Sequence, residues 1–196
     1  MAPFFKDYFI TWIPKDTVGG DIWLFNELRH KDECLLLFID CTGHGVPGAF
    51  VTMIVKAIER EIISKTTKHP EFEISPAIIM GYFNKTMKTL LRQETKDSLS
   101  NVGWDGGIIY YNRRTQILKF AGAETPLFYI DENEEFKTIK GKDFPFGKKK
   151  FGNIIKENHT KSMEKLQNIF MQKMMEYENA IPNNDRNDDM TIIAFE

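Results

Sequence analysis

Acidic residues stand beside glycine or asparagine at three places that are far apart in the chain. Asp21 ends the run Val-Gly-Gly-Asp, Asp40 opens Asp-Cys-Thr-Gly-His-Gly, and Asp188 and Asp189 lie in Arg-Asn-Asp-Asp-Met-Thr. Mg²⁺ and Mn²⁺ prefer oxygen ligands, and a glycine-rich turn lets backbone carbonyls approach an ion. Each segment taken alone is more often simple turn chemistry. Together they predict a site for hard divalent cations.

Two further side chains near such turns have both a chemical and a structural interpretation. His44 is a candidate general acid, because imidazole titrates near neutral pH, but in a Gly-His-Gly turn we favour a local hydrogen bond that shapes the turn. Asp105, in Trp-Asp-Gly-Gly, is either an additional metal ligand, directly or through another residue, or part of a turn. No other side chain is assigned to catalysis.

The strands that must position these residues are indicated by short apolar runs between turns. Residues 35–39 are apolar without interruption, which predicts a central strand covered on both faces. Short turns join the later strands, and this favours antiparallel pairing. Strands are predicted at residues 8–12, 22–28, 34–42, 108–111, 117–121, 127–130, 136–139 and 191–195.

Helices are indicated where apolar residues recur at helical spacing. One begins near Pro47, with Phe50, Ile54, Ala57, Ile58 and Ile62 predicted to face a sheet. A second follows Ser75 and Pro76, which suit a helix cap and first turn. Others are predicted at 151–158 and 162–179. The order of elements predicts an α+β domain in which helices cover antiparallel sheet.

Length and composition favour one soluble globular domain over residues 1–196. The chain has 42% hydrophobic residues and a formal net charge of −2, so it lacks the broad cationic field that nucleic acid or an anionic membrane attracts. Cys34 and Cys41 lie in one strand-like run at odd separation, so their side chains should point to opposite faces and stay reduced, as in the cytoplasm. Because strand-like sequence begins soon after Met1, we expect a sensor or membrane region upstream in a longer protein.

The acidic segments, in their order, resemble the SpoIIE/RsbU-type serine/threonine phosphatases of the protein phosphatase 2C (PPM) superfamily. The resemblance is carried by Val-Gly-Gly-Asp, by Asp-Cys-Thr-Gly-His-Gly-Val-Pro-Gly-Ala-Phe at the start of a helix, and by Arg-Asn-Asp-Asp-Met-Thr before the last strand. Phe-Ala-Gly-Ala followed by Pro-Leu-Phe is similar to that family's central hairpin. The SiaA-like group is the most similar. The resemblance implies a layered α/β/β/α sandwich of antiparallel sheets.

The resemblance also implies a role for each acidic position. Asp40 would bridge two divalent cations, Mn²⁺ or Mg²⁺, while Asp21 and the Cys41 carbonyl would bind one and Asp188 the other. Asp189 and Asp105 would be outer-shell or alternative ligands. The cations would activate a water molecule that attacks phosphorus in line, so the protein need supply no nucleophilic side chain.

The substrate implied by the resemblance is phosphoserine or phosphothreonine on a bacterial regulatory protein, a STAS-like anti-sigma-factor antagonist. We expect a cytoplasmic domain that could form a homodimer and has no nucleic-acid or membrane partner. The alternative is a catalytically silent phosphatase-like module that only binds such a partner. A hydrolase of small phosphate esters is less favoured, because no phosphate-cradling P-loop is found.

One expected motif is absent. Members of the family carry Thr-Asp-Gly or Ser-Asp-Gly between the central hairpin and the last helices, and its aspartate is a metal ligand. Here Thr-Ile-Lys-Gly-Lys runs directly into Asp-Phe-Pro-Phe-Gly, so a segment near residues 140–144 is missing from the pattern. The missing aspartate would leave one of the two metal sites short of a carboxylate, which is the main argument for the silent alternative.

Overall fold

The computed structural model describes the chain except residues 70, 72, 94–101, 140–147 and 180–187. The segment that we expect to be missing near residues 140–144 lies outside the described residues. The described part is a mixed α+β structure with antiparallel sheets and four α-helices.

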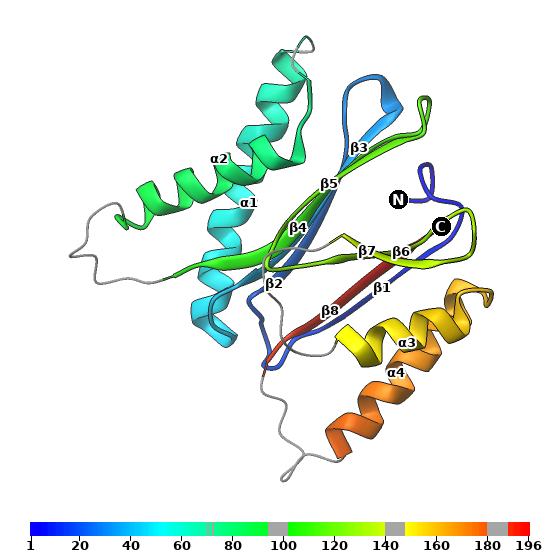
Figure 1. The fold of residues 1–196 in the computed structure, drawn as a ribbon. Coiled ribbons are helices and arrows are strands. Elements are labelled where there is room, and N and C mark those ends of the chain that lie inside the picture. Colours follow the sequence, from blue (N-terminus) through cyan, green and yellow to red (C-terminus); the bar gives the residue numbers. More distant parts are fainter. Residues whose placement is uncertain (70, 72, 94–101, 140–147, 180–187) are drawn as a thin grey trace.

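A four-stranded antiparallel sheet lies at the centre of the fold (Figure 1). Its strands are β2 (Asp21–Glu27), β3 (Glu33–Cys41), β4 (Trp104–Asn112) and β5 (Ile117–Ala123), in the order β2-β3-β4-β5. A short 3₁₀ helix, η1 (Arg29–Lys31), links β2 to β3. The prediction of a central strand at residues 34–42 is confirmed, because β3 pairs on both sides and nearly all of it is buried.

Two smaller antiparallel pairs lie beside this sheet. The chain ends meet in the first, where β1 (Tyr8–Ile13) pairs with β8 (Met190–Phe195). The second is the hairpin of β6 (Leu127–Ile130) and β7 (Phe136–Ile139). The N- and C-termini therefore lie near each other (Figure 1).

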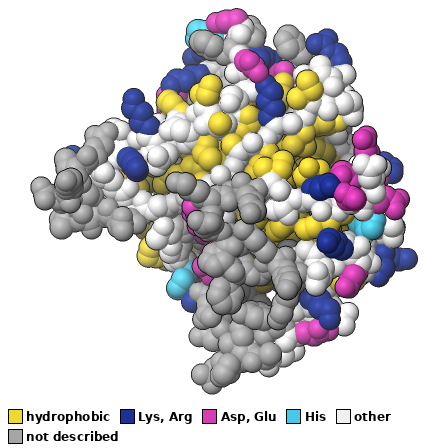
Figure 2. Space-filling view, viewed as in Figure 1, with side chains coloured by type: hydrophobic (Ala, Val, Ile, Leu, Met, Phe, Trp, Pro, Cys, Tyr) yellow, Lys and Arg dark blue, Asp and Glu magenta, His cyan; other side chains and the backbone are white. Residues whose placement is uncertain are grey.

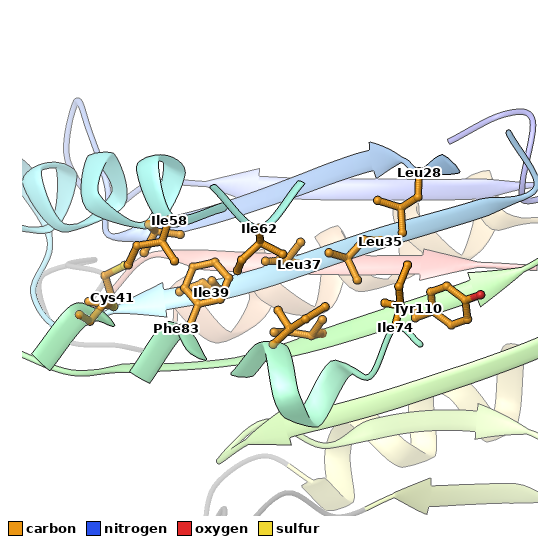
Figure 3. Close-up of a cluster of buried hydrophobic side chains, with 14 of the residues drawn as sticks. Leu28, Leu35, Leu37, Ile39, Cys41, Ile58, Ile62, Ile74, Phe83 and Tyr110 are labelled. Atoms are coloured by element: carbon orange, nitrogen blue, oxygen red, sulfur yellow. The ribbon is translucent and has the colours of Figure 1, made fainter. Parts of the chain in front are cut away.

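Helices α1 (Gly45–Lys68) and α2 (Pro76–Leu90) cover one face of the four-stranded sheet. Figure 3 shows the core between these helices and the sheet, in which Leu35, Leu37 and Ile39 follow one another along β3 and Ile58 and Phe83 lie near the Ile39 end. These five side chains are at most 2% exposed. Apolar area removed from water on this scale is the main stabilising contribution to a domain fold.

Helix α4 (Met163–Asn179) packs on β1 of the β1–β8 pair, and α3 (Lys148–Asn158) packs against α4 and β7. Phe9 of β1 is buried against Leu166 and Phe170 of α4. No helix in the described ranges is long and apolar enough to cross a membrane.

Cys34 and Cys41 are both free thiols that lie on opposite faces of β3, as their spacing predicts. Cys41 belongs to the core under α1 and α2. Cys34 packs instead with Phe4 and Phe5 on the other face. The two faces of β3 are thus identified by these residues, and Asp40 lies on the Cys34 side because side chains alternate along a strand.

The predicted inward face of α1 is partly wrong. Phe50 is 64% exposed and Ala57 is also exposed, whereas Val51 and Val55 are buried. The reason is geometric: Val51, Val55, Ile58 and Ile62 form the stripe that meets the sheet, and Phe50 lies about 100° around the helix from Val51. Ile78 and Leu90 of α2 are likewise exposed.

Apolar side chains also reach the surface away from these helices. Ile117 and Leu118 of β5, Tyr129 of β6 and Ile139 of β7 are each at least 40% exposed. Figure 2 shows hydrophobic side chains gathered near the middle of the face seen in Figure 1, with charged side chains distributed around them.

Candidate metal centre

Three carboxylates form a row across the four-stranded sheet. Asp40 on β3 lies directly opposite Asp21 on β2 and directly opposite Asp105 on β4. Residues opposite each other in antiparallel strands share a face and have neighbouring side chains. We call Asp21, Asp40 and Asp105 the acidic row. It lies on the face of the sheet opposite to α1 and α2.

The segment before β8 adds two more carboxylates. Asp189 holds the loop between β1 and β2, because its Oδ1 accepts a hydrogen bond from the Lys15 backbone N–H at 2.6 Å and its Oδ2 accepts from the Gly20 N–H. The Asp21 N–H donates to the same Oδ2 at 3.3 Å. Asp188 is exposed, and its Oδ1 accepts from the Asp189 N–H at 2.9 Å. Asp189 therefore shapes the loop that carries Asp21.

A hydroxyl group links the two sheets at this point. Thr191, on β8, donates its hydroxyl hydrogen to Oδ2 of Asp21, with an oxygen–oxygen distance of 2.6 Å. The sequence pattern predicts Thr191 only as the first residue of a strand. Thr191 follows Asp188 by three residues in the motif, and this position could have marked it as a neighbour of the acidic residues. The strand with which β8 pairs could not be predicted from the motif.

Glycines allow the backbone to cross closely beneath the row. The Cys41 N–H donates to the Gly20 carbonyl at 3.1 Å. A Cβ atom on Gly20 would lie 2.3 Å from the Gly43 oxygen, and one on Gly48 would lie 2.2 Å from the same oxygen. Only glycine fits at both positions, so the Gly-Gly-Asp and Gly-Val-Pro-Gly motifs bring β2 and the start of α1 together.

The carboxyl groups of the row are in an environment that disfavours their charge. Burial raises the pKa of Asp40 to about 7, and the carboxylates of Asp21, Asp188, Asp105 and Asp189 add to this effect. Burial also raises the pKa of Asp21 to about 6, although the Thr191 hydrogen bond acts in the opposite direction. The pKa of Asp105 is raised by burial as well. Bound cations would relieve this repulsion.

The thiol of Cys41 takes no part in the row. It is 2% exposed and faces the core under the helices. Burial, with the Asp40 and Asp21 charges, raises the pKa of this thiol to about 12, so it stays protonated. The backbone carbonyl is then the group that Cys41 could offer to a cation.

His44 makes its contacts outside its own turn. Its Nδ1 lies 2.7 Å from Oδ2 of Asp16, and its Nε2 lies 3.2 Å from the ammonium of Lys15. His44 is the residue before α1, and it forms no side-chain hydrogen bond to the helix N-terminus. The local bond that we expected is thus replaced by a link between α1 and the β1–β2 loop. Lys15 and Asp16 carry no motif that sequence analysis could have used.

The donor chemistry fits hard divalent cations, although the side chains are not drawn together around one point. In the described part of the chain, no group of three His, Cys, Asp or Glu residues is placed to hold a metal ion. The row still supplies carboxylate oxygens with unfavourable mutual charge, which is what Mg²⁺ and Mn²⁺ bind. Of the predicted ligands, Asp21 and Asp40 are brought together, Asp105 joins them, and Asp188 contributes its charge from the surface.

The fold that carries the acidic row matches that of PPM-type phosphatase domains, also called PP2C domains. The chain is similar to the SiaA-PP2C domain of Pseudomonas aeruginosa, with a TM-score of 0.77 and 26% identity over 96% of this chain and 85% of that one. The predicted resemblance to this family is confirmed in the structure. No protein-family model and no curated protein matches the sequence.

Two structures of the SpoIIE phosphatase domain from Bacillus subtilis share the fold. One, which includes a fragment of the regulatory domain, has a TM-score of 0.66 and 14% identity over 95% of this chain and 61% of that one. The other, a crystal form without domain swapping, has a TM-score of 0.55 and 13% identity over 95% of this chain and 91% of that one.

Proposed function

We propose that this domain is a metal-dependent protein serine/threonine phosphatase. The observation that carries the proposal is the acidic row, in which Asp21, Asp40 and Asp105 lie opposite one another on three adjacent strands. The likeness to the SiaA-PP2C domain supports it. Asp40 and Asp21, with the Cys41 carbonyl and Asp188, would hold two divalent cations, and Asp189 and Asp105 would support them.

The residues of the chain would bind the cations and keep the carboxylate ligands in position. When bound, two such cations polarise the phosphoryl oxygens and activate a water molecule for attack on phosphorus. Asp40, at the centre of the row, is the carboxylate best placed to serve both. Asp189 fixes the Gly20–Asp21 backbone, and Thr191 fixes one oxygen of Asp21, so that the carboxylates keep their positions. No side chain needs to act as a nucleophile.

An exposed apolar stripe beside the site supports a protein substrate. Val46, Phe50 and Met53, at the start of α1, are 62%, 64% and 68% exposed. Their spacing places them along one side of the helix. The stripe begins at Val46, two residues after His44. A contiguous apolar surface next to a polar site favours contact with a protein rather than with a small ester. A phosphorylated STAS-like regulatory protein fits the family resemblance as the substrate.

A silent partner-binding module is the second candidate. It is favoured by the exposure of Asp188 and by the absence of a preformed three-residue metal group among the described residues. Such a module would dock the same phosphoprotein through α1 without hydrolysing it.

Phosphate release separates the two functions. Purified domain would be incubated with a phosphoserine STAS-type protein and with p-nitrophenyl phosphate, in Mn²⁺, in Mg²⁺ and in excess EDTA. If the domain is a phosphatase, it should release phosphate from the phosphoprotein in the presence of the metal, and this release should disappear in EDTA. Equal turnover in EDTA would contradict the mechanism. Binding of the phosphoprotein with no release in either metal would favour the silent module.

A further inference from the structure

Asp16, His44 and Lys15 form a chain of contacts between the start of α1 and the β1–β2 loop, which leads to Asp21. Asp16 Oδ2 lies 2.7 Å from His44 Nδ1, and His44 Nε2 lies 3.2 Å from the Lys15 ammonium. The Asp16 carboxylate rests against the start of α1, because a Cβ atom on Gly45 would lie 3.0 Å from its Oδ2. The imidazole is thus held from both sides by two consecutive residues of the β1–β2 loop.

The two partners determine where the hydrogen of the imidazole lies. A lysine ammonium can only donate, so Nε2 of His44 must accept from Lys15. The hydrogen of the neutral ring is then on Nδ1 and is donated to Asp16. A protonated ring would instead point an N–H at the ammonium and place two positive charges 3.2 Å apart. In this state His44 has no Nε2 hydrogen to give to a leaving group.

The backbone of Lys15 is tied to the segment beside the row, while its ammonium is held by His44. Its backbone N–H donates to Oδ1 of Asp189 at 2.6 Å, and Asp189 in turn binds the backbone at Gly20. A phosphoryl dianion that approaches the row meets several carboxylates, which repel it. A cation fixed at the edge of the row would counter that repulsion and bind a phosphoryl oxygen.

We propose that Asp16 and His44 are positioning residues that hold the Lys15 ammonium for binding the phosphoryl group of the substrate. The proposal rests on the proposed phosphatase function and adds a cation-binding contact that the acidic motifs do not include. Asp16 and Lys15 together set the tautomer of His44, and His44 sets the place of the ammonium. Lys15 is the residue of the three that touches substrate.

The kinetic test uses Lys15→Met, Asp16→Ala and Asp16→Asn in the metal-loaded domain. Lys15→Met should raise KM for the phosphoprotein roughly tenfold and leave kcat within about twofold, since one charge-assisted hydrogen bond of ground-state binding is lost. Asp16→Ala should have a smaller effect in the same direction. Asp16→Asn retains an oxygen acceptor for the Nδ1–H of His44, so its KM should return most of the way to the wild-type value. Lys173→Met, at an exposed ion pair on α4, is the matched control and should change neither constant.

Two further measurements do not depend on turnover. Imidazole ¹⁵N NMR of wild-type protein should show His44 with its hydrogen on Nδ1, and Asp16→Ala should shift it toward the Nε2 form. Inorganic phosphate, titrated into the Mg²⁺-loaded domain, should bind roughly tenfold more weakly to Lys15→Met than to wild type or Lys173→Met. Both results can be obtained even if the domain proves to be silent, so failure of the proposed function is distinguished from failure of this proposal.

Three outcomes would overturn the proposal. One is a wild-type protein in which the neutral ring of His44 carries its hydrogen on Nε2. Another is unchanged phosphate affinity in folded Lys15→Met. The third is a His44→Gln variant that loses kcat at constant KM together with one limb of its pH profile, because His44 would then be a proton donor.

Discussion

Asp21 on β2 lies directly opposite Asp40 on β3, and the pKa of both carboxyl groups is raised, to about 6 and about 7. A carboxyl group whose pKa is higher in the folded state stabilises the fold below its unfolded pKa, near 3.8. That contribution is lost as pH rises through the folded pKa. The metal-free domain should therefore lose it between about pH 4 and pH 7.

The pH dependence can be isolated by comparing wild type with Asp40→Asn in EDTA. Wild type should lose about 2 kcal/mol of unfolding free energy relative to the variant between pH 4.5 and pH 7.5, less than the full shifts imply because Asp40 is only half-buried. Urea unfolding at each pH measures the difference. Saturating Mg²⁺ should stabilise wild type much more than the variant. A constant difference across this range would show that the row is not electrostatically strained.

Asp40→Asn should also remove phosphatase activity while the domain stays folded. Asp40 is the central member of the row, so losing its charge weakens both cation sites, and we expect a fall in kcat of at least about 100-fold. Phosphate release at saturating Mn²⁺ measures it. Glu164→Gln, at an exposed position of α4, is the control and should retain full activity. Turnover of the Asp40→Asn variant near the wild-type level would mean that Asp40 is not the bridging ligand.

Gly48→Ala should destabilise the domain through the backbone crossing beneath the site. The new Cβ would lie 2.2 Å from the Gly43 oxygen and 2.8 Å from Gly20 Cα, and neither backbone atom can move without shifting the row. We expect a loss of about 2–4 kcal/mol in unfolding free energy, measured by urea titration. Gly81→Ala, within α2 and with nothing within 4 Å, is the matched control. It should stabilise by up to about 1 kcal/mol, since alanine favours helix. Equal effects of the two changes would contradict the close crossing.

Most of the element order could be predicted from the sequence, because apolar periodicity and turn residues act locally. The strands at 127–130 and 136–139 were predicted with the boundaries that the structure shows. The burial of β3 on both faces also followed from its unbroken apolar run. The predicted face of α1 was partly wrong, because Phe50 and Val51 are both apolar and only the position of the sheet decides which is buried.

The acidic residues could be found from the motifs, but not their mutual arrangement. Register decides that Asp105 stands opposite Asp40, and register depends on long-range pairing that no local pattern encodes. The Asp16–His44 contact was missed for the same reason. Asp16 lies in a loop without a motif, and it meets His44 only because the loop folds back over the start of α1.

The hydroxyl of Thr191 joins β8 to the acidic row. Thr191 donates to Oδ2 of Asp21 at 2.6 Å, and this bond acts to lower the pKa of a carboxyl group that burial raises to about 6. Thr191→Val keeps the side-chain shape and removes the donor, so the pKa of Asp21 should rise further and Asp21 should hold its proton to higher pH. Metal binding requires the ionised carboxylate. The concentration of Mg²⁺ needed for half-maximal thermal stabilisation at pH 6.5 should therefore rise roughly threefold to tenfold, and less at pH 8.5.

Thr191→Ser is the matched control, because it keeps the hydroxyl and removes only a methyl group. Its midpoint for Mg²⁺ should stay within about twofold of wild type at both pH values. If Thr191→Val and Thr191→Ser shift the midpoint equally, the effect comes from packing between β8 and β1 and not from the hydrogen bond. If the shift in Thr191→Val is the same at pH 6.5 and pH 8.5, Asp21 is ionised throughout and proton competition does not limit binding. A larger shift of the Mg²⁺ midpoint at the lower pH, seen in Thr191→Val but not in Thr191→Ser, would identify Asp21 as a carboxylate that must ionise before the cation can bind.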